Sequence, residues 1–600
     1  MDEQNRNLIL ASVLCLAVII IWPFLVPPPA EAPQPAVATQ ETSTIAPAAA
    51  PVTAQQRTAP EELAEGRTDA PRIAIDTKEL SGSISLQGGR IDDLALKSYQ
   101  TSLDEGANIV RLFRGTDEPE AFYADFGWAP GGALGFEDVP TATTIWNADA
   151  SATLTENTPV TLSWDNGKGL VFTRVISIDE NFMFSVEQSV TNTADAAARL
   201  APYSALTRHG IPTTLKNFFI IHEGAMRQTG EELSEYDYDD ISDFDRDDRW
   251  GATADVAQIQ QNGWLGFTDH YWMSMLIPAS AQPFTGVLQY NEARNTFRSE
   301  ARLPTVDLAA GETISVSTQL FAGAKEWETI RNYENDGGIY NFLDSIDWGW
   351  FFFLTKPIFA VLHWLNAVIG NMGWSIIALT LLIKAILLPL AYKSYVSMAR
   401  MKELQPEMEK LKEAAGDDRE KMQKGMIELY KKNKVNPASG CLPILMQIPI
   451  FFSLYKVIFV TIELRHAEWI GWIRDLSAPD PSSILNLFGL LPYATPEPTS
   501  IFYILSLGVL PIILGISMWL QQKLNPAPTD ATQAMIFAWM PWVFMFMLGS
   551  FASGLVIYWI ANNTITFSQQ YLIMRSQGIK PDVFGNIKKG FSRKSKTEET

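Results

Sequence analysis

The sequence predicts a multidomain membrane protein: an all-α membrane part of six spans (an N-terminal anchor plus a five-helix core), a β-sandwich and a helical hairpin. Three observations predict this fold class. Apolar residues gather in a few long runs of the 600-residue chain. Residues 71–340 carry 19 Lys and Arg against 40 Asp and Glu, a net −21 that equals the net charge of the whole chain. Short alternating patterns fill this acidic part, and alternation is typical of strands.

The chain begins with a short segment, 1–6, and an apolar run that predicts a transmembrane anchor over 7–26. From Leu8 to Val26 the run has 19 positions without a charge, long enough to cross a bilayer core of ~30 Å. A cleaved signal peptide is the alternative, but its apolar region is usually ~7–15 residues behind a positive flank. We favour an uncleaved anchor. Residues 27–70, rich in Pro, Ala, Thr and Gln, predict a disordered linker.

Residues 71–330 predict the β-sandwich. Residues 174–178 and 182–186 alternate between apolar and polar side chains, and Asp179-Glu180-Asn181 separates them, which is typical of a hairpin. Residues 313–317 repeat the alternation. Because no helices alternate with these strands, a sandwich is favoured over an α/β sheet. The acidic stretch 231–248 predicts an exposed loop, with a calcium site as the less favoured alternative.

The second half of the chain predicts five more spans. Aromatic side chains crowd residues 346–370 with charges between them, which indicates an amphipathic helix lying in the membrane interface. Another spanning helix is the alternative for that segment. The apolar runs that follow predict the spans 374–392, 441–463, 501–521, 533–549 and 554–574.

Basic residues predict the orientation of these spans in a bacterial inner membrane. The loop 393–434 carries 11 Lys and Arg against 8 acids, and the tail 575–600 carries 7 against 3. Basic loops stay in the cytoplasm, so both termini are expected there. Residues 27–345 and the loop 464–500 are then periplasmic. A span at 346–370 would turn the basic loop outward, which favours the interfacial helix.

One charged residue, Lys384, lies near the middle of its predicted span. At 1.5 Å per residue it stands ~12 Å from the helix end at Tyr392. An intramembrane lysine costs at least ~2.5–3.5 kcal/mol. Because the other spans hold no acidic partner, a water-filled cavity is favoured over a buried ion pair. Lys456 lies nearer the outer end of its span, where snorkelling or pairing with Glu463 explains it.

Further polar residues occur inside the spans and predict a hydrophilic groove around Lys384. Hydrogen bonding between helices is the alternative for each of them alone. These residues are Gln447, Asn562, Asn563 and Thr566.

The loop 393–434 predicts a helical hairpin with a methionine-rich seam. Apolar residues recur at spacings of three and four on both sides of a break at Gly416. Packing of the two arms against each other and docking of a partner are both open explanations for the seam. Its residues are Met401, Leu404, Met408, Leu411, Met422 and Met426.

Several classes of protein are disfavoured. An acidic domain argues against nucleic-acid binding. No phosphate-binding Gly-rich loop exists, and the five histidines and two cysteines show no metal-ligand spacing. With no pairing of nucleophile and base, we expect neither an enzyme nor a cofactor or metal. Cys15 and Cys441 imply no disulfide framework.

Ordered motifs from about 340 to 575 resemble the YidC membrane insertases. The motifs are Leu382-Ile-Lys384, Asn436-Pro437-Ala-Ser-Gly-Cys441-Leu-Pro443-Ile-Leu-Met-Gln447, Asp475-Leu-Ser-Ala-Pro, Met540-Pro541 and Ser553-Gly-Leu-Val-Ile-Tyr558-Trp559. The resemblance implies a five-helix core with a groove open to the cytoplasm and the lipid. It places the family's groove arginine at Lys384, its groove glutamine at Gln447 and a groove tryptophan at Trp559.

The resemblance also implies a function. A member of this family inserts nascent integral membrane proteins into the inner membrane and helps them fold, alone or with the Sec translocon. Nascent chains, the ribosome, the Sec translocon and the lipid bilayer are therefore the expected partners, and the hairpin is implied to recruit substrates. Two alternatives from other classes are a transporter that uses Lys384 as a ligand, and a carbohydrate-active or scaffolding domain merely anchored to the membrane.

Overall fold

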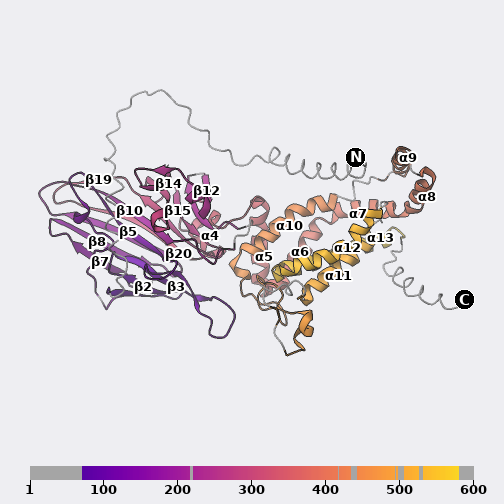
Figure 1. Cartoon of the computed structure of the whole chain (residues 1–600), viewed down its shortest axis with the longest axis horizontal. Helices are drawn as coiled ribbons and strands as arrows, with labels where there is room; N and C mark the ends of the chain where they lie inside the picture. Colours follow the sequence, from indigo (N-terminus) through magenta and orange to yellow (C-terminus); the bar gives the residue numbers. More distant parts are fainter. Residues whose placement is uncertain are drawn as a thin grey trace, which may run out of the picture. The chain divides into compact units, whose positions relative to one another are not determined.

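The computed structural model describes residues 70–149, 151–216, 221–230, 232–416, 418–433, 435, 442–492, 495–496, 506–525 and 531–579. The predicted anchor 7–26, nearly all of the linker 27–70 and most of the tail 575–600 lie outside these residues. The described chain has a β-rich part followed by a helical part, coloured indigo to magenta and orange to yellow in Figure 1.

The strands form where apolar and polar residues alternate. Along β8 (Leu170–Ile178) every second residue is buried, as a strand with one face on a core requires. It pairs antiparallel with β9 (Met183–Asn192), so that Ile178 lies opposite Phe184. The predicted hairpin is therefore confirmed, and the turn residues Asp179 to Asn181 lie at its tip.

Two sheets are formed within the described residues. The strands of the twelve-stranded sheet are β1 (Arg72–Asp76), β2 (Leu80–Ser85), β3 (Arg90–Gln100), β4 (Ile109–Phe113), β5 (Phe122–Gly131), β6 (Thr153–Leu154), β10 (Ala198–His209), β13 (Arg246–Asp247), β14 (Ala252–Ile259), β17 (Phe284–Asn291), β18 (Thr296–Arg302) and β19 (Val306–Leu308). The eight-stranded sheet has β8 and β9 together with β7 (Val160–Asp165), β11 (Gly224–Thr229), β12 (Glu232–Asp237), β15 (Gly263–Thr268), β16 (Trp272–Pro278) and β20 (Thr313–Ala324).

Aromatic side chains join the two sheets face to face. Phe122 of β5 meets Phe267 of β15 with ring centroids 6.1 Å apart, and Trp128 of β5 meets Phe172 of β8 at 6.4 Å. All four side chains are buried in one core. The predicted β-sandwich is confirmed.

The acidic stretch 231–248 is not the exposed loop that the sequence predicts. It contains strand β12 and the short helix α3 (Tyr238–Ser242). Tyr238 and Ile241 of this helix are buried, and the Tyr238 ring stacks on Phe267. Two apolar residues spaced for one helix face therefore fold the stretch back onto the sandwich, although its acids outnumber them.

The helical part follows a short helix, α4 (Trp327–Asn335). Its helices are α5 (Phe352–Ile369), α6 (Met372–Ile386), α7 (Leu388–Glu403), α8 (Gln405–Ala415), α9 (Arg419–Lys432), α10 (Leu442–Val460), α11 (Val509–Leu524), α12 (Ala531–Met547) and α13 (Ser553–Ser576). Helix α13 packs against α6, α7, α10 and α11, so these four helices have α13 as a common neighbour.

Length and composition alone identify few of these helices as membrane spans. Among the described residues, α5 and the segment Thr532–Ser550 are each long and apolar enough, and α6 with α7 qualify only as a bent pair. Two shorter apolar helices lie at Gln447–Val460 and in α11. Since α5 is long enough to span, the interfacial position of 346–370 stays a prediction, as does the number of crossings.

Helices α8 and α9 lie in the segment 393–434 and contact each other, while the cytoplasmic hairpin over that segment stays a prediction. Helix α8 ends before Gly416, and Asp418 caps α9 by accepting a hydrogen bond from the backbone N–H of Lys421 at 3.0 Å. Leu404 and Met408 are buried against Val435. Met401 and Met426 pack half-buried on this cluster, Leu411 lies beside Gly425 of the other arm, and Met422 is half-buried. These contacts favour packing of the arms against each other.

Candidate functional site

Lys384 lies in the last turn of α6 and not in the middle of a straight helix. The sequence predicts one helix over 374–392, but α6 ends at Ile386 and α7 begins at Leu388, with an angle of 69° between them. Pro389 accounts for the break, because proline lacks the backbone N–H and restricts the residue before it. The carboxyl end of a helix favours a cation, so the break gives Lys384 a better electrostatic position than a mid-helix site.

The Lys384 ammonium has an amide as its partner. It is 8% exposed, and its Nζ donates a hydrogen bond to Oε1 of Gln447 on α10 at 2.9 Å. Across the described part of the chain, no carboxylate lies within 4.0 Å of it. Among the described residues, Lys384 therefore has no acidic partner, as the sequence predicts.

The Gln447 amide is fixed by its neighbours. Because an ammonium only donates, the amide oxygen must face Lys384. Its Nε2 then donates to the Tyr558 hydroxyl at 2.9 Å and to Oδ1 of Asn562 at 2.7 Å. Tyr558 and Asn562 are four residues apart on α13 and so share one helix face. Three helices thus meet in a buried polar cluster, which we call the Lys384 cluster: Lys384, Gln447, Tyr558 and Asn562.

Helix α13 also contacts the backbone at Lys384. Nε2 of Gln569 donates to the Lys384 carbonyl at 3.4 Å. The last carbonyls of a helix lack partners within it, and inside a membrane such groups must be satisfied by the protein. Gln569 therefore supports the end of α6 where the chain breaks.

Three predicted groove residues do not join this cluster through any contact in the described structure. Asn563 points from α13 to α11, where its amide donates to the Ser517 hydroxyl at 3.1 Å, so hydrogen bonding between helices explains it. Trp559 stacks on Phe451 with centroids 5.3 Å apart and meets Phe551 edge-on at 6.1 Å. Thr566 is buried one turn beyond Asn562.

Lys456 pairs with a residue that the sequence does not predict. Its ammonium contacts Asp347, just before α5, in an ion pair that is largely buried on both sides. The expected partner Glu463 instead accepts a hydrogen bond from the backbone N–H of Trp327 at 3.3 Å. The correction follows from chain folding: Asp347 is 109 residues from Lys456 in sequence, and only tertiary structure brings them together.

Comparison with known proteins places this chain in a family. The family models for the YidC periplasmic domain and for the 60Kd inner membrane protein match residues 72–361 and 364–580. A protein of Ruegeria sp. (strain TM1040), named membrane protein insertase YidC, is 64% identical over 606 residues, with 100% of this chain and 99% of the relative covered. The chain belongs to the YidC family of membrane protein insertases. The resemblance of the sequence motifs to that family is confirmed.

One further relative agrees with this membership. The YidC insertase of Dinoroseobacter shibae is 60% identical over 606 residues and is covered, like this chain, to 100%. A solved structure described as an active YidC insertase with the first transmembrane domain resolved aligns with a TM-score of 0.36 and 16% identity. That alignment covers 84% of this chain and 93% of the other. The relatives are named insertases, in agreement with the expectation that a member of the YidC family is not an enzyme.

Sequence reasoning missed two members of the site in this YidC-family chain. Tyr558 lies one residue before Trp559 and looks like part of an aromatic run, yet its hydroxyl contacts Gln447. Gln569 follows Asn562 by seven residues, and this two-turn spacing was the available signal that it lies on the same face of α13. Tyr558 is hidden by its aromatic neighbour, and Gln569 lies in the polar stretch Ser568-Gln569-Gln570, so neither stands out from its surroundings in sequence.

The surroundings of the Lys384 cluster are apolar and exposed. On α6, Leu381 and Ile386 are 57% and 69% exposed, and Leu382 is exposed as well. Helix α12, which packs on α11, also exposes apolar side chains, and Trp539 is 65% exposed. Such faces suit lipid and not water. The YidC-family chain therefore holds its buried lysine close to surface that hydrocarbon would cover.

Proposed function

We propose that this chain inserts nascent integral membrane proteins into the inner membrane and helps them fold, with the Lys384 cluster as the site that receives the polar part of the substrate. Similarity over the whole chain to proteins named insertases supports the activity. The observation that carries the site is the Lys384 ammonium, which is buried, has an amide partner and has no carboxylate nearby among the described residues.

The proposed role follows from the donors of an ammonium group. A lysine ammonium has three donors and no acceptor, and one of them is used by Gln447. A substrate carboxylate or carbonyl can accept the others, and hydrogen bonds to charged groups are the stronger ones. Acidic residues flanking a substrate segment would thus enter the membrane at lower free-energy cost. Lysine offers a point charge where arginine offers a planar fork, so attraction and not bidentate geometry is the proposed effect.

We place a hydrophilic groove at this cluster, open to the cytoplasm and to lipid. Gln447 and Asn562 would hydrogen-bond the polar part of the substrate while its apolar segment slides along the exposed face of α6 that holds Leu381, Leu382 and Ile386. Burial of that segment in lipid supplies the driving free energy. The membrane potential adds ~2.3 kcal/mol per charge per 100 mV for acidic segments moving outward. No nucleotide hydrolysis is required.

The proposed topology has six crossings, with 27–345 in the periplasm and both termini in the cytoplasm. Support comes from the excess of Lys and Arg in 393–434 and in 575–600. In this arrangement the hairpin of α8 and α9 faces the cytoplasm. We propose that its exposed side, which includes Ile427, meets nascent chains. The basic tail would meet the ribosome, and the membrane part would act alone or beside the Sec translocon.

Complementation of a strain depleted of its own insertase tests the site. We expect Lys384→Arg to support insertion and Lys384→Ala to fail, because only the first keeps a cation in the cluster. Lys78→Ala is the matched control, since it removes one exposed lysine of the β-rich part that pairs with Glu79. Lys384→Ala that inserts substrates at the wild-type rate would refute the proposed role of the charge.

Photocrosslinking separates an insertase from a transporter. A photoreactive residue at position 381, which is exposed on α6 one turn before Lys384 and leaves the cluster intact, should capture a stalled nascent membrane protein. The same residue at position 103, exposed in the β-rich part, serves as the control. Capture at 103 alone, or uptake of a small solute by reconstituted vesicles without any insertion, would favour the other functions.

A further inference from the structure

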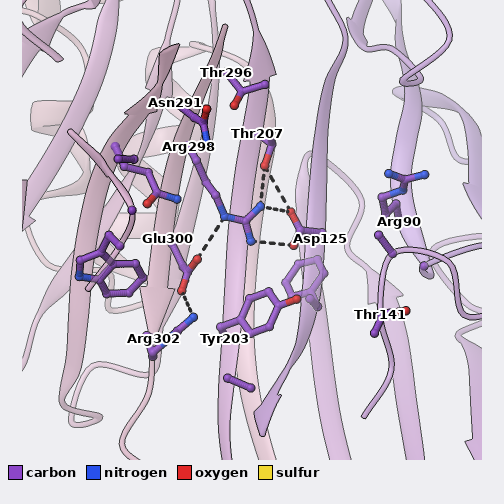
Figure 2. Close-up of a pocket in the computed structure, with 18 of the residues that line it drawn as sticks. Arg90, Asp125, Thr141, Tyr203, Thr207, Asn291, Thr296, Arg298, Glu300 and Arg302 are labelled. Carbon is purple, nitrogen blue, oxygen red and sulfur yellow. Dashed lines mark hydrogen bonds and ion pairs between the residues drawn. The ribbon is translucent and has the colours of Figure 1, made fainter. Parts of the chain in front are cut away.

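A second site lies in the β-rich part, in a cavity of about 350 Å³ on one face of the twelve-stranded sheet. Side chains from β3, β5, β10, β17 and β18 form its floor, and four segments at its edge, which hold Gly88, Thr141, Trp250 and Arg294, form its walls. Figure 2 shows the floor residues Arg298, Glu300, Asp125 and Tyr203 beside one another, with Arg90 beyond Asp125. The Lys384 cluster shares no residue with this cavity.

The strand register puts these polar residues on one face of the sheet. Along β18, Phe297 and Ala301 are in the sandwich core, so Arg298, Glu300 and Arg302 face the other way. Their partners on β10 are Thr207, Ala205 and Tyr203, in the same order. Ala205 in turn pairs with Asp125 of β5. The cavity floor is therefore built by pairing of adjacent strands and needs no loop to place it.

Two arginines of the floor are matched by two carboxylates. Arg298 makes a bidentate pair with Asp125, both N–O distances being 3.0 Å, and its Nε donates to Glu300 at 3.1 Å (Figure 2). Arg302 pairs with Glu300 at 2.6 Å. These pairs present fixed donors and acceptors side by side, an arrangement that suits adjacent hydroxyl groups of a ligand.

Arg90 is not matched. It is 6% exposed and lies over the Tyr123 ring at 5.1 Å, and its Nε is buried without a hydrogen-bond partner. No carboxylate in the described structure lies within 4.0 Å of its guanidinium. A buried cation without an anion is unfavourable for folding. Oε1 of Gln289, opposite Arg298 on the next strand, is also buried without a partner.

Aromatic faces complete the cavity. Tyr123, Tyr203 and Trp250 line it. The Tyr203 ring lies over Gly127, where an added Cβ would stand 2.7 Å from the tyrosine hydroxyl. Only glycine therefore leaves room for that ring to lie flat across the strand. Flat apolar surface beside paired donors and acceptors suits a molecule with both hydroxyl groups and C–H faces.

We infer that this cavity binds an anionic sugar, a small polyhydroxylated molecule with one carboxylate or phosphate. Five arginines and two acids line the cavity, although the chain segment 71–340 has a net charge of −21. The ligand anion pairs with Arg90, its hydroxyl groups bond to Arg298, Glu300 and Gln289, and its ring lies on the tyrosines. The inference is independent of membrane insertion.

Titration of the full chain in lipid nanodiscs tests it, with the fluorescence of the tryptophans or heat as readout. The probes are glucuronate, glucose 6-phosphate and glucose. We expect one of the two anionic sugars to bind at least about tenfold more tightly than glucose, since hydrogen bonds to a charged group are the strong ones. The arm that binds identifies the anion. Equal affinity for glucose, or competition by acetate or inorganic phosphate as strong as by the sugars, overturns the inference.

Variants of Arg90 and Gln289 test which residue contributes to sugar affinity and which to the preference for an anion. Arg90→Met should remove the preference for the anionic sugar and leave the unfolding temperature equal or higher, because the buried charge has no partner to lose. Arg111→Met, which removes an exposed arginine paired with Glu118 outside the cavity, is the control. Gln289→Leu should weaken all sugars and keep the preference. Unchanged anion preference in Arg90→Met, or unchanged affinities in Gln289→Leu, contradicts the assignment.

Discussion

The Lys384 ammonium is held by an amide, and this choice of partner has a chemical consequence. A neutral partner satisfies one donor and leaves the positive charge in place. A carboxylate there would neutralise it. The cluster thus keeps a cation at the end of α6 that an incoming anion can pair with, and Gln447 holds that cation in position.

Gln447→Glu tests whether a neutral partner is needed, because it keeps the side-chain length and places a negative charge beside Lys384. We expect the chain to fold and an ion pair to form with Lys384. Insertion of substrates with acidic flanks should then fall at least about tenfold, because a fixed anion competes for the ammonium. Insertion of radiolabelled substrates into vesicles measures it. Gln447→Met, which adds no charge, should keep the preference for acidic flanks. Wild-type handling of acidic flanks by Gln447→Glu would rule out the proposed attraction.

His270 is a second residue with a strong local consequence, at the contact between the β-rich part and α10. Its Nε2 donates to the Phe459 carbonyl at 2.7 Å, while its Nδ1 is buried without a partner. Burial lowers the pKa of His270 from 6.5 to about 3, and the nearby cations Lys325, Lys216 and Arg465 act in the same direction. The folded chain therefore keeps this ring neutral.

Acid should weaken the fold through His270. Its stabilising contribution is fully present above pH 6.5 and is lost as the pH falls toward 3, because only the unfolded chain binds the proton in that range. Between pH 7 and pH 5 we expect a loss of about 2 kcal/mol in the free energy of unfolding. Thermal unfolding of the detergent-solubilised chain measures it. His270→Gln should show a smaller loss, and equal pH dependence in both proteins would contradict the assignment.

At the scale of elements, the break between α6 and α7 decides where Lys384 lies. Pro389 removes one backbone donor, so α6 ends and exposes its last carbonyls, one of which accepts from Gln569. Without the break, the ammonium would lie in mid-helix, farther from the favourable end of the dipole. The geometry of the cluster thus depends on a residue that touches none of its members through a side-chain hydrogen bond.

Pro389→Ala should reduce the bend of 69°, because alanine restores the donor and favours a helix. Spin labels at Leu381 and Lys393, both exposed, should move apart as α6 and α7 straighten, and insertion should fall. Electron paramagnetic resonance measures the distance. Leu388→Ala, which keeps the proline, is the control and should leave both unchanged. A straightened helix with full insertion would show that the break is dispensable.

At the scale of the whole molecule, the cluster draws its side chains from α6, α10 and α13 and none from the β-rich part. The two parts nevertheless share buried contacts, such as His270 on Phe459. The helical part therefore owes some of its stability to the sandwich, but the chemistry of the cluster does not require it.

Deletion of residues 71–325 should leave insertion largely intact and lower the unfolding temperature, because the surface around Phe459 becomes exposed. Complementation of the depleted strain measures the activity. Adding Lys384→Ala to the deleted chain should abolish what remains. Loss of insertion by the deletion alone, at normal amounts of protein in the membrane, would assign the work to the sandwich or to its contacts with the helices.

Local patterns predict much of this structure. The alternation in 174–186 predicts its hairpin, and the spacing of Met401, Leu404 and Met408 predicts the arms that pack together. Lys384 and Gln447 stand out because polar groups are rare in apolar runs. Asn563 stands out for the same reason and Trp559 is implied by the family resemblance, yet both contact other neighbours, since neither signal tells which way a side chain points on its helix.

The sequence by itself determined the family and the β-rich and helical parts. It also determined that Lys384 lies inside a span while the other spans offer no acidic partner. These follow from composition, periodicity and motif order, which are local properties of the chain. Tertiary structure decided that α6 breaks after Lys384, that Gln447 and Tyr558 surround it, and that Asp347 and not Glu463 pairs with Lys456. Those outcomes depend on contacts between residues up to 111 positions apart, and packing alone sets such contacts.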